Sequence, residues 1–182
     1  MNTNTGKPSL WFEIRRTLQL AAPVMIGLVA GFGMNFVDTV MAGRLPEKEV
    51  ALAALATGGA LWSAGLMVVI GLLMAVQPSV AQLDGAGRQR DAAAVARQGL
   101  WLALGLAVPF FLLVYHGAAI LHALDVDPAI IPVADGYLRA LAFGAPFMCA
   151  VMLQRFFSEG TGHTRPTMYI GIAGVLLNIP LN

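Results

Sequence analysis

The chain has 182 residues, of which 58% are hydrophobic and only 12% are charged, and its mean hydropathy is +0.73. Soluble domains carry about 25% charged residues, so this composition excludes an ordinary soluble domain and predicts an all-α protein that crosses a membrane several times. The net charge of +1 provides no basic surface for a nucleic acid, and the three histidines lack the spacing of metal ligands. We therefore expect no nucleic-acid partner and no cofactor.

Three charge-free stretches are long enough to form transmembrane helices. They extend from Thr17 to Val37, from Val50 to Leu83 and from Gln98 to Leu124. Each reaches the roughly 20 residues that an α-helix needs to cross about 30 Å of hydrocarbon. We predict three complete spans over this part of the chain.

Two further spans are predicted. One, near 136–156, carries Arg139 close to one end, where its long stem can extend to the membrane interface. The other begins after Pro166 and stays uncharged through Asn182. A helix that ends in hydrocarbon leaves its last carbonyls without partners, so we expect the sequence to be a piece of a larger protein. The predicted organisation is a cytoplasmic segment 1–16 and a partial transmembrane bundle 17–182, with spans near 17–42, 50–78, 98–121, 136–156 and 166–182.

The orientation follows from the basic residues in the connections. Eight of them share one side of the membrane: Lys7, Arg15, Arg16, Arg88, Arg90, Arg97, Arg155 and Arg165. Three lie on the other side: Arg44, Lys48 and Arg139. Because cytoplasmic loops carry the excess of Lys and Arg, we expect a cytoplasmic N-terminus and a multi-pass protein of the inner (plasma) membrane.

A carboxylate interrupts the first span at Asp38. The residues at helical spacing before it are Met34, Asn35, Gly31 and Gly27, which are small, flexible or polar. Such a face is typical of contact with another helix or with a water-filled cavity, and an acid inside a span is a functional-site hypothesis by default.

The fifth span carries a similar face, made of Gly171, Gly174, Asn178 and Asn182. Both helices start in the cytoplasm and therefore run parallel, and the two asparagines fall at a depth comparable to that of Asp38. We predict that these side chains meet. Three simpler interpretations stay open: Asp38 at the outer interface, glycine faces that only pack, and asparagines that only link helices by hydrogen bonds.

Four motifs resemble one known family. They are "GFGMNFVDTVMAGRL" (31–45), "VAQLDGAGR" (80–88), "EGTGHTRPTMYIG" (159–171) and "GVLLNIPLN" (174–182). In this order and at these intervals they strongly resemble the N-terminal half of multidrug and toxic compound extrusion (MATE) transporters, and most closely the NorM-like bacterial group. The resemblance covers about Leu18 to Asn182.

The resemblance implies twelve helices in two six-helix lobes, of which this chain would supply about five helices of the first. The missing C-terminal lobe would then be its main partner. The family exports amphipathic, often cationic drugs in exchange for H⁺ or Na⁺. Within that scheme Asp38 matches the acid of the first helix, and Asn178 matches an asparagine of the fifth. Asn182 falls where some members carry an aspartate, which puts a Na⁺ site at Asp38 in doubt and favours protonation.

Two further residues complete the expected coupling-ion and substrate site. Gln154 is a candidate polar partner from the fourth span, and Met34 is one of several methionines that suit an adaptable cavity wall. We expect antiport by competition, in which an ionised Asp38 attracts a cationic drug and the uptake of H⁺ or Na⁺ cancels that attraction.

Two other classes of protein would also keep an acid within the membrane or share this topology. A polytopic membrane enzyme would need a second catalytic group beside Asp38, and the spans contain no such arrangement, so we expect no enzyme. A lipid-linked sugar flippase of related topology would line its cavity with arginines for the diphosphate. The three complete spans offer only Arg97, at a cytoplasmic end.

Overall fold

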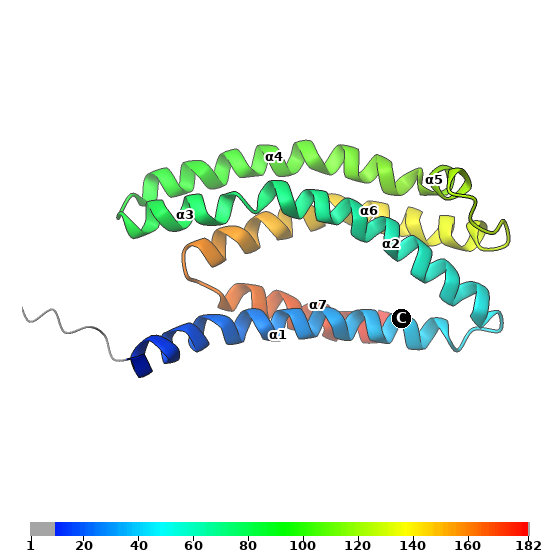
Figure 1. Cartoon of the computed structure of the whole chain (residues 1–182), viewed down its shortest axis with the longest axis horizontal. Coiled ribbons are helices and arrows are strands. Elements are labelled where there is room, and N and C mark those ends of the chain that lie inside the picture. Colours follow the sequence, from blue (N-terminus) through cyan, green and yellow to red (C-terminus); the bar gives the residue numbers. More distant parts are fainter. Residues whose placement is uncertain (1–9, 182) are drawn as a thin grey trace, which may run out of the picture.

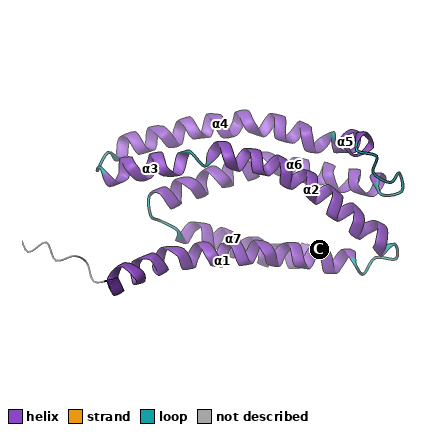
Figure 2. Cartoon of the chain, viewed as in Figure 1, coloured by secondary structure: helices purple, strands orange, loops and turns teal. Residues whose placement is uncertain are grey.

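The computed structural model describes the backbone of residues 10–181, together with their side chains except those at positions 10, 16 and 178–181. The described part is built of helices joined by short turns and contains no strand (Figure 2). The helices in chain order are α1 (Leu10–Ala42), α2 (Lys48–Leu73), α3 (Val76–Gly85), α4 (Gln89–Tyr115), α5 (Gly117–Ala123), α6 (Ile131–Gly160) and α7 (Arg165–Leu181).

Four helical stretches are long and apolar enough to cross a membrane. They are Trp11–Ala42, Lys48–Gly85, Gln89–Tyr115 and Ile131–Gly160, and the described part of α7 is a shorter apolar helix. The predicted class, an all-α polytopic membrane protein, is thereby confirmed.

The second membrane-spanning stretch is broken, whereas the sequence pattern predicted one continuous span near 50–78. α2 ends at Leu73 and α3 begins at Val76, with Pro78 in the first turn of α3. A proline has no N–H to donate to the carbonyl four residues earlier, here that of Met74, and its ring crowds that carbonyl. The break therefore falls where Pro78 removes the continuing hydrogen bond.

The helices form two groups (Figure 1). α2, α3, α4 and α6 pack on one another, with the short α5 beside the start of α6, whereas α1 packs chiefly along α7. The fully buried large side chains all belong to the first group: Leu73, Val80, Val114, Leu121, Leu138 and Cys149. No described side chain of α1 or α7 is fully buried. The core therefore lies within the α2–α6 group.

Glycines allow close helix contacts in that core. A methyl group at Gly65 of α2 would lie 2.7 Å from Phe110 of α4, and one at Gly99 of α4 would lie 2.6 Å from Leu153 of α6. Small residues at helix contacts are the usual solution within membranes, where lipid provides no hydrophobic drive for association.

The turn between α6 and α7 reverses the chain and lays α7 along α1. The amide of His163 donates to the carbonyl of Ser158 at 2.8 Å, and Gly162 has a φ of +72°. This is a glycine-based C-cap, since residues with a Cβ rarely adopt a positive φ. The motif that begins at Glu159 thus ends α6 and sets the direction of α7.

Candidate ion and substrate site

Asp38 lies in the last part of α1 and is partly buried. Its carboxylate acts electrostatically on the phenol of Tyr137, which belongs to α6. The acid of the first span therefore lies within electrostatic reach of the α2–α6 group.

Tyr137 is not among the residues that the sequence pattern predicted for this site. A phenol inside a span is a polar group that needs a partner, so a signal existed. Nothing in the sequence, however, indicates which helix faces that phenol, because the neighbour is set by the way α1 and α6 approach each other.

The ring of Tyr137 is held by α2. A methyl group at the buried Gly58 would lie 2.9 Å from Cδ1 and 3.4 Å from Cε1 of Tyr137. Such a distance is too short for a real carbon contact, so only glycine at position 58 leaves room for the ring in its present place.

Asn35 and Thr39 bond within their own helix. The Asn35 amide Nδ2 donates to the carbonyl of Gly31 at 3.1 Å, and the Thr39 hydroxyl donates to the carbonyl of Asn35 at 2.8 Å. Both side chains are exposed. Local bonding of this kind leaves the carbonyl oxygen of the Asn35 side chain available to a ligand or to water.

α1 and α7 meet along part of the two small-residue faces. A methyl group at Gly171 would lie 3.2 Å from the Cα of Gly27, and one at Gly174 would lie 3.5 Å from the sulfur of Met34. Gly31, in contrast, has nothing within 4 Å of a Cβ position. Met34 therefore belongs to the contact between α1 and α7, while Gly31 faces open space.

The two predicted asparagine partners are not described at the side-chain level. Asn178 lies in α7, but its side chain is outside the described residues, as is all of Asn182. Their contact with Asp38 stays a prediction.

Gln154 lies elsewhere along α6. It follows Tyr137 by 17 positions, which corresponds to about 25 Å of helix. Its Nε2 donates to the hydroxyl of Ser158 at 2.9 Å, and its buried Oε1 has no partner within the described part of the chain. Of these two residues of α6, Tyr137 lies within electrostatic reach of Asp38, and the role of Gln154 in the site stays a prediction.

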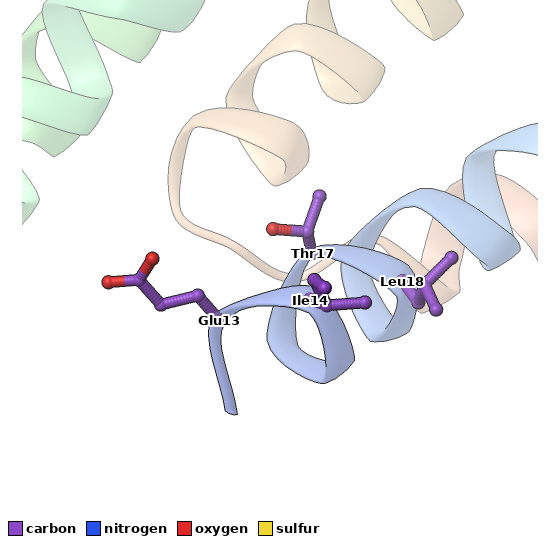
Figure 3. A pocket seen from close by; sticks show the side chains of 4 residues that line it. All are labelled: Glu13, Ile14, Thr17 and Leu18. Carbon is purple, nitrogen blue, oxygen red and sulfur yellow. The ribbon is translucent and has the colours of Figure 1, made fainter. Parts of the chain in front are cut away.

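Two hollows lie toward the opposite end of α1. A cavity of about 440 Å³ lies between α1, α3, the end of α6 and the turn that follows it. It is lined by Thr17, Leu20, Ala21, Val24, Met25, Gln77, Glu159, Gly162 and Thr164. Figure 3 shows a second hollow, of about 350 Å³, whose described lining residues are Glu13, Ile14, Thr17 and Leu18 of α1. Because all four of these residues come from one helix, we treat the second hollow as a surface feature. Neither hollow includes Asp38.

The fold and the position of Asp38 define a helical membrane protein that keeps an acid within a span. Comparison with known proteins gives the family. Residues 23–182 match the MatE family model, and the chain belongs to this family.

Several curated proteins are similar to the chain. The Multidrug resistance protein NorM of Aliivibrio fischeri is 40% identical over 170 residues, which cover 93% of this chain and 36% of that protein. NorM of Vibrio cholerae is also 40% identical over 170 residues, covering 93% of this chain and 37% of the relative. The Multidrug resistance protein MdtK of Edwardsiella ictaluri is 39% identical over 173 residues, covering 94% and 37%. The chain thus spans little more than a third of the length of these relatives.

Proposed function

We propose that the chain is the N-terminal part of an inner-membrane antiporter that exports amphipathic, often cationic drugs in exchange for H⁺ or Na⁺. The observation that carries this proposal is the partly buried Asp38 carboxylate within a membrane-competent helix of a chain that belongs to the MatE family. Family membership and the multidrug-resistance names of the relatives support export of xenobiotics as the activity of the whole protein.

The packing of α1 on α7 supports a role for Asn178 beside this acid. Met34 lies against Gly174, and α1 and α7 run in the same direction. Four residues further along each helix, about 6 Å, the corresponding level holds Asp38 on α1 and position 178 on α7. We infer that position 178 lies level with Asp38, so that an asparagine there can bond to the carboxylate.

The exchange follows from competition for one negative charge. A carboxylate in a poorly hydrated site attracts cations much more strongly than it would in water, because the effective dielectric is lower. A cationic drug binds while Asp38 is ionised, and an incoming cation then neutralises the carboxylate and releases the drug. The phenol of Tyr137 is able to donate a hydrogen bond, and in this scheme such a bond to the ionised carboxylate would favour the drug-binding state.

Protonation is the form of coupling that we favour. Position 182 is an asparagine, so this part of the site has a single carboxylate at Asp38 to offer a metal ion. Na⁺ binds best to several oxygen ligands with enough negative charge to offset its dehydration, whereas a proton needs only one carboxylate.

The test uses the full-length transporter in cells that lack their own drug pumps. Asp38→Asn keeps the size of the side chain but removes its charge, so we expect gradient-driven efflux of a cationic dye to be lost while the protein remains in the membrane. The matched control is Glu47→Gln, because Glu47 is an exposed carboxylate in the turn that follows α1. This control should transport at the wild-type rate.

Two results would contradict the proposal. Wild-type efflux by Asp38→Asn would remove this carboxylate from the mechanism. Failure of the wild-type protein itself to change dye accumulation or drug susceptibility would remove the drug-export assignment.

A further inference from the structure

An aromatic cluster joins the end of α4 to the first half of α6. It consists of Phe111, Tyr115, His116 and Phe143. The rings of Phe111 and Tyr115 stack with centroids 5.4 Å apart, and Phe143 meets them edge-on at 5.7 Å and 6.4 Å. His116 adds a further edge contact to Tyr115 at 5.3 Å. Together these rings form an amphipathic surface between two helices.

A pair of opposite charges lies on this cluster. The guanidinium carbon of Arg139 lies 5.5 Å from the centre of the Tyr115 ring, a cation–π contact. The Nε of Arg139 is also 3.0 Å from the Asp135 carboxylate, one turn earlier on α6. The two side chains remain 55% and 23% exposed in the part of the chain that the structure describes, which leaves both accessible to a ligand there.

The position of Arg139 along α6 indicates what surrounds it. Arg139 and Arg155 are 16 residues apart, about 24 Å of helix, which is less than the hydrocarbon thickness of about 30 Å. Arg155 belongs to the predicted cytoplasmic side, so the backbone at Arg139 lies near the opposite boundary of the hydrocarbon. The side chain of Arg139 is long enough to reach the headgroups there. Tyr115, which ends α4, fits the aromatic belt at the same level.

The chemistry available at that level is that of phospholipid headgroups. The ion pair with Asp135 uses Nε, and the terminal nitrogens of the Arg139 guanidinium carry four further N–H groups that match the oxygens of a phosphate. Next to this position, Phe143 and Phe147 of α6 are 65% and 76% exposed and provide an apolar surface for acyl chains.

We propose that Arg139, Asp135 and Tyr115 form a binding site for a zwitterionic phospholipid with a primary amine, of the phosphatidylethanolamine type. The phosphate accepts hydrogen bonds from the guanidinium, and the ammonium donates to the Asp135 carboxylate. This inference does not depend on the transport activity, since it requires only that α4 and α6 cross a membrane.

The pairing of charges distinguishes this lipid from its alternatives. An acidic lipid such as phosphatidylglycerol has no cation for Asp135, and its negative charge is repelled by that carboxylate. A choline headgroup has a cation without an N–H to donate, and one face of Tyr115 is already covered by Arg139. Only a primary amine satisfies both members of the ion pair.

The experiment measures lipid retention by the purified full-length protein with native mass spectrometry. Phosphatidylethanolamine, phosphatidylcholine and phosphatidylglycerol of identical acyl chains are added in turn. We expect the wild-type protein to bind phosphatidylethanolamine at least about fivefold more tightly than the other two, because each rival lacks one charge-assisted hydrogen bond. Arg139→Gln should abolish this preference, and Asp135→Asn should reduce phosphatidylethanolamine binding to the level of phosphatidylcholine.

Two further variants serve as controls for this experiment. Arg44→Gln removes an exposed arginine from the turn at the same end of the bundle and should leave the preference unchanged. If Arg139→Gln does not fold, Arg139→Lys keeps the charge without the planar fork and should retain a weaker preference. Equal retention of the three lipids by the wild type, an undiminished preference in the Arg139 variants, or the same loss in Arg44→Gln would overturn the proposal.

Discussion

At the scale of single residues, the candidate site depends on an acid, a phenol and a glycine from three helices. Asp38 acts on Tyr137 across the space between α1 and α6, and Gly58 of α2 leaves the room that the Tyr137 ring occupies. The glycine makes no polar contact with the acid, yet it controls where the phenol lies.

This arrangement predicts that Gly58→Ala impairs transport by the full-length protein. The new methyl group would lie 2.9 Å from the Tyr137 ring and would push the phenol away from its position relative to Asp38. Overpacking of this kind costs about 1–3 kcal/mol. We expect a lower rate of dye efflux per molecule of transporter in the membrane, measured in vesicles.

The adjacent glycine is a matched control for this substitution. Gly59 lies on the same helix and has nothing within 4 Å of its Cβ position. Gly59→Ala should therefore transport normally, and equal activity of the two variants would show that the Tyr137 position does not matter.

At the scale of the helices, the pairing of α1 with α7 depends on their glycines. Gly171 and Gly27 bring the two backbones so close that a methyl group at Gly171 would lie 3.2 Å from the Cα of Gly27. Backbone cannot move aside as a side-chain tip can, so the helices themselves must separate to accommodate the added carbon.

We therefore expect Gly171→Ala to lower the thermal stability of the full-length protein in nanodiscs, by about 1 kcal/mol or more. Gly31→Ala is the comparison, because its methyl group would meet nothing within 4 Å and alanine is the better helix former. Gly31→Ala should be neutral or slightly stabilising. If the melting temperature of Gly171→Ala is not lower than that of Gly31→Ala, the proposed close contact between the α1 and α7 backbones is wrong.

At the scale of the whole molecule, the distribution of charge predicts the orientation in the membrane. The turn between α1 and α2 and the turn between α3 and α4 lie at opposite ends of the molecule (Figure 1). The α3–α4 end carries most of the basic residues and should face the cytoplasm.

Single cysteines test that orientation. Glu47 and Ala86 are exposed, one in each of these turns, and the native Cys149 is buried. In a Cys149→Ala background without other cysteines, a membrane-impermeant maleimide applied to intact cells should label Glu47→Cys and spare Ala86→Cys until the membrane is opened. The reverse pattern of labelling would invert the assigned orientation.

Several properties of this protein were predictable from its sequence because the membrane enforces them. Hydrocarbon requires every backbone polar group to be satisfied within the chain, so long apolar runs must become helices. Because a charged side chain is costly to place in hydrocarbon, an acid such as Asp38 within an apolar run indicates a functional site. The four motifs indicated the family, which the match over residues 23–182 confirmed.

The neighbours of each residue were decided only by the tertiary structure. Helix periodicity places a residue on a face but does not identify the helix opposite, which depends on how closely glycines and rings allow the backbones to approach. For that reason the sequence did not indicate that Tyr137 lies near Asp38, and it did not show that Gly27 and Met34 contact α7 whereas Gly31, on the same face, does not. The sequence alone determined which segments enter the membrane, because that outcome depends on each segment's own free energy of transfer from water. The tertiary structure decided which helices pack against each other, because each contact depends on the side chains of two segments.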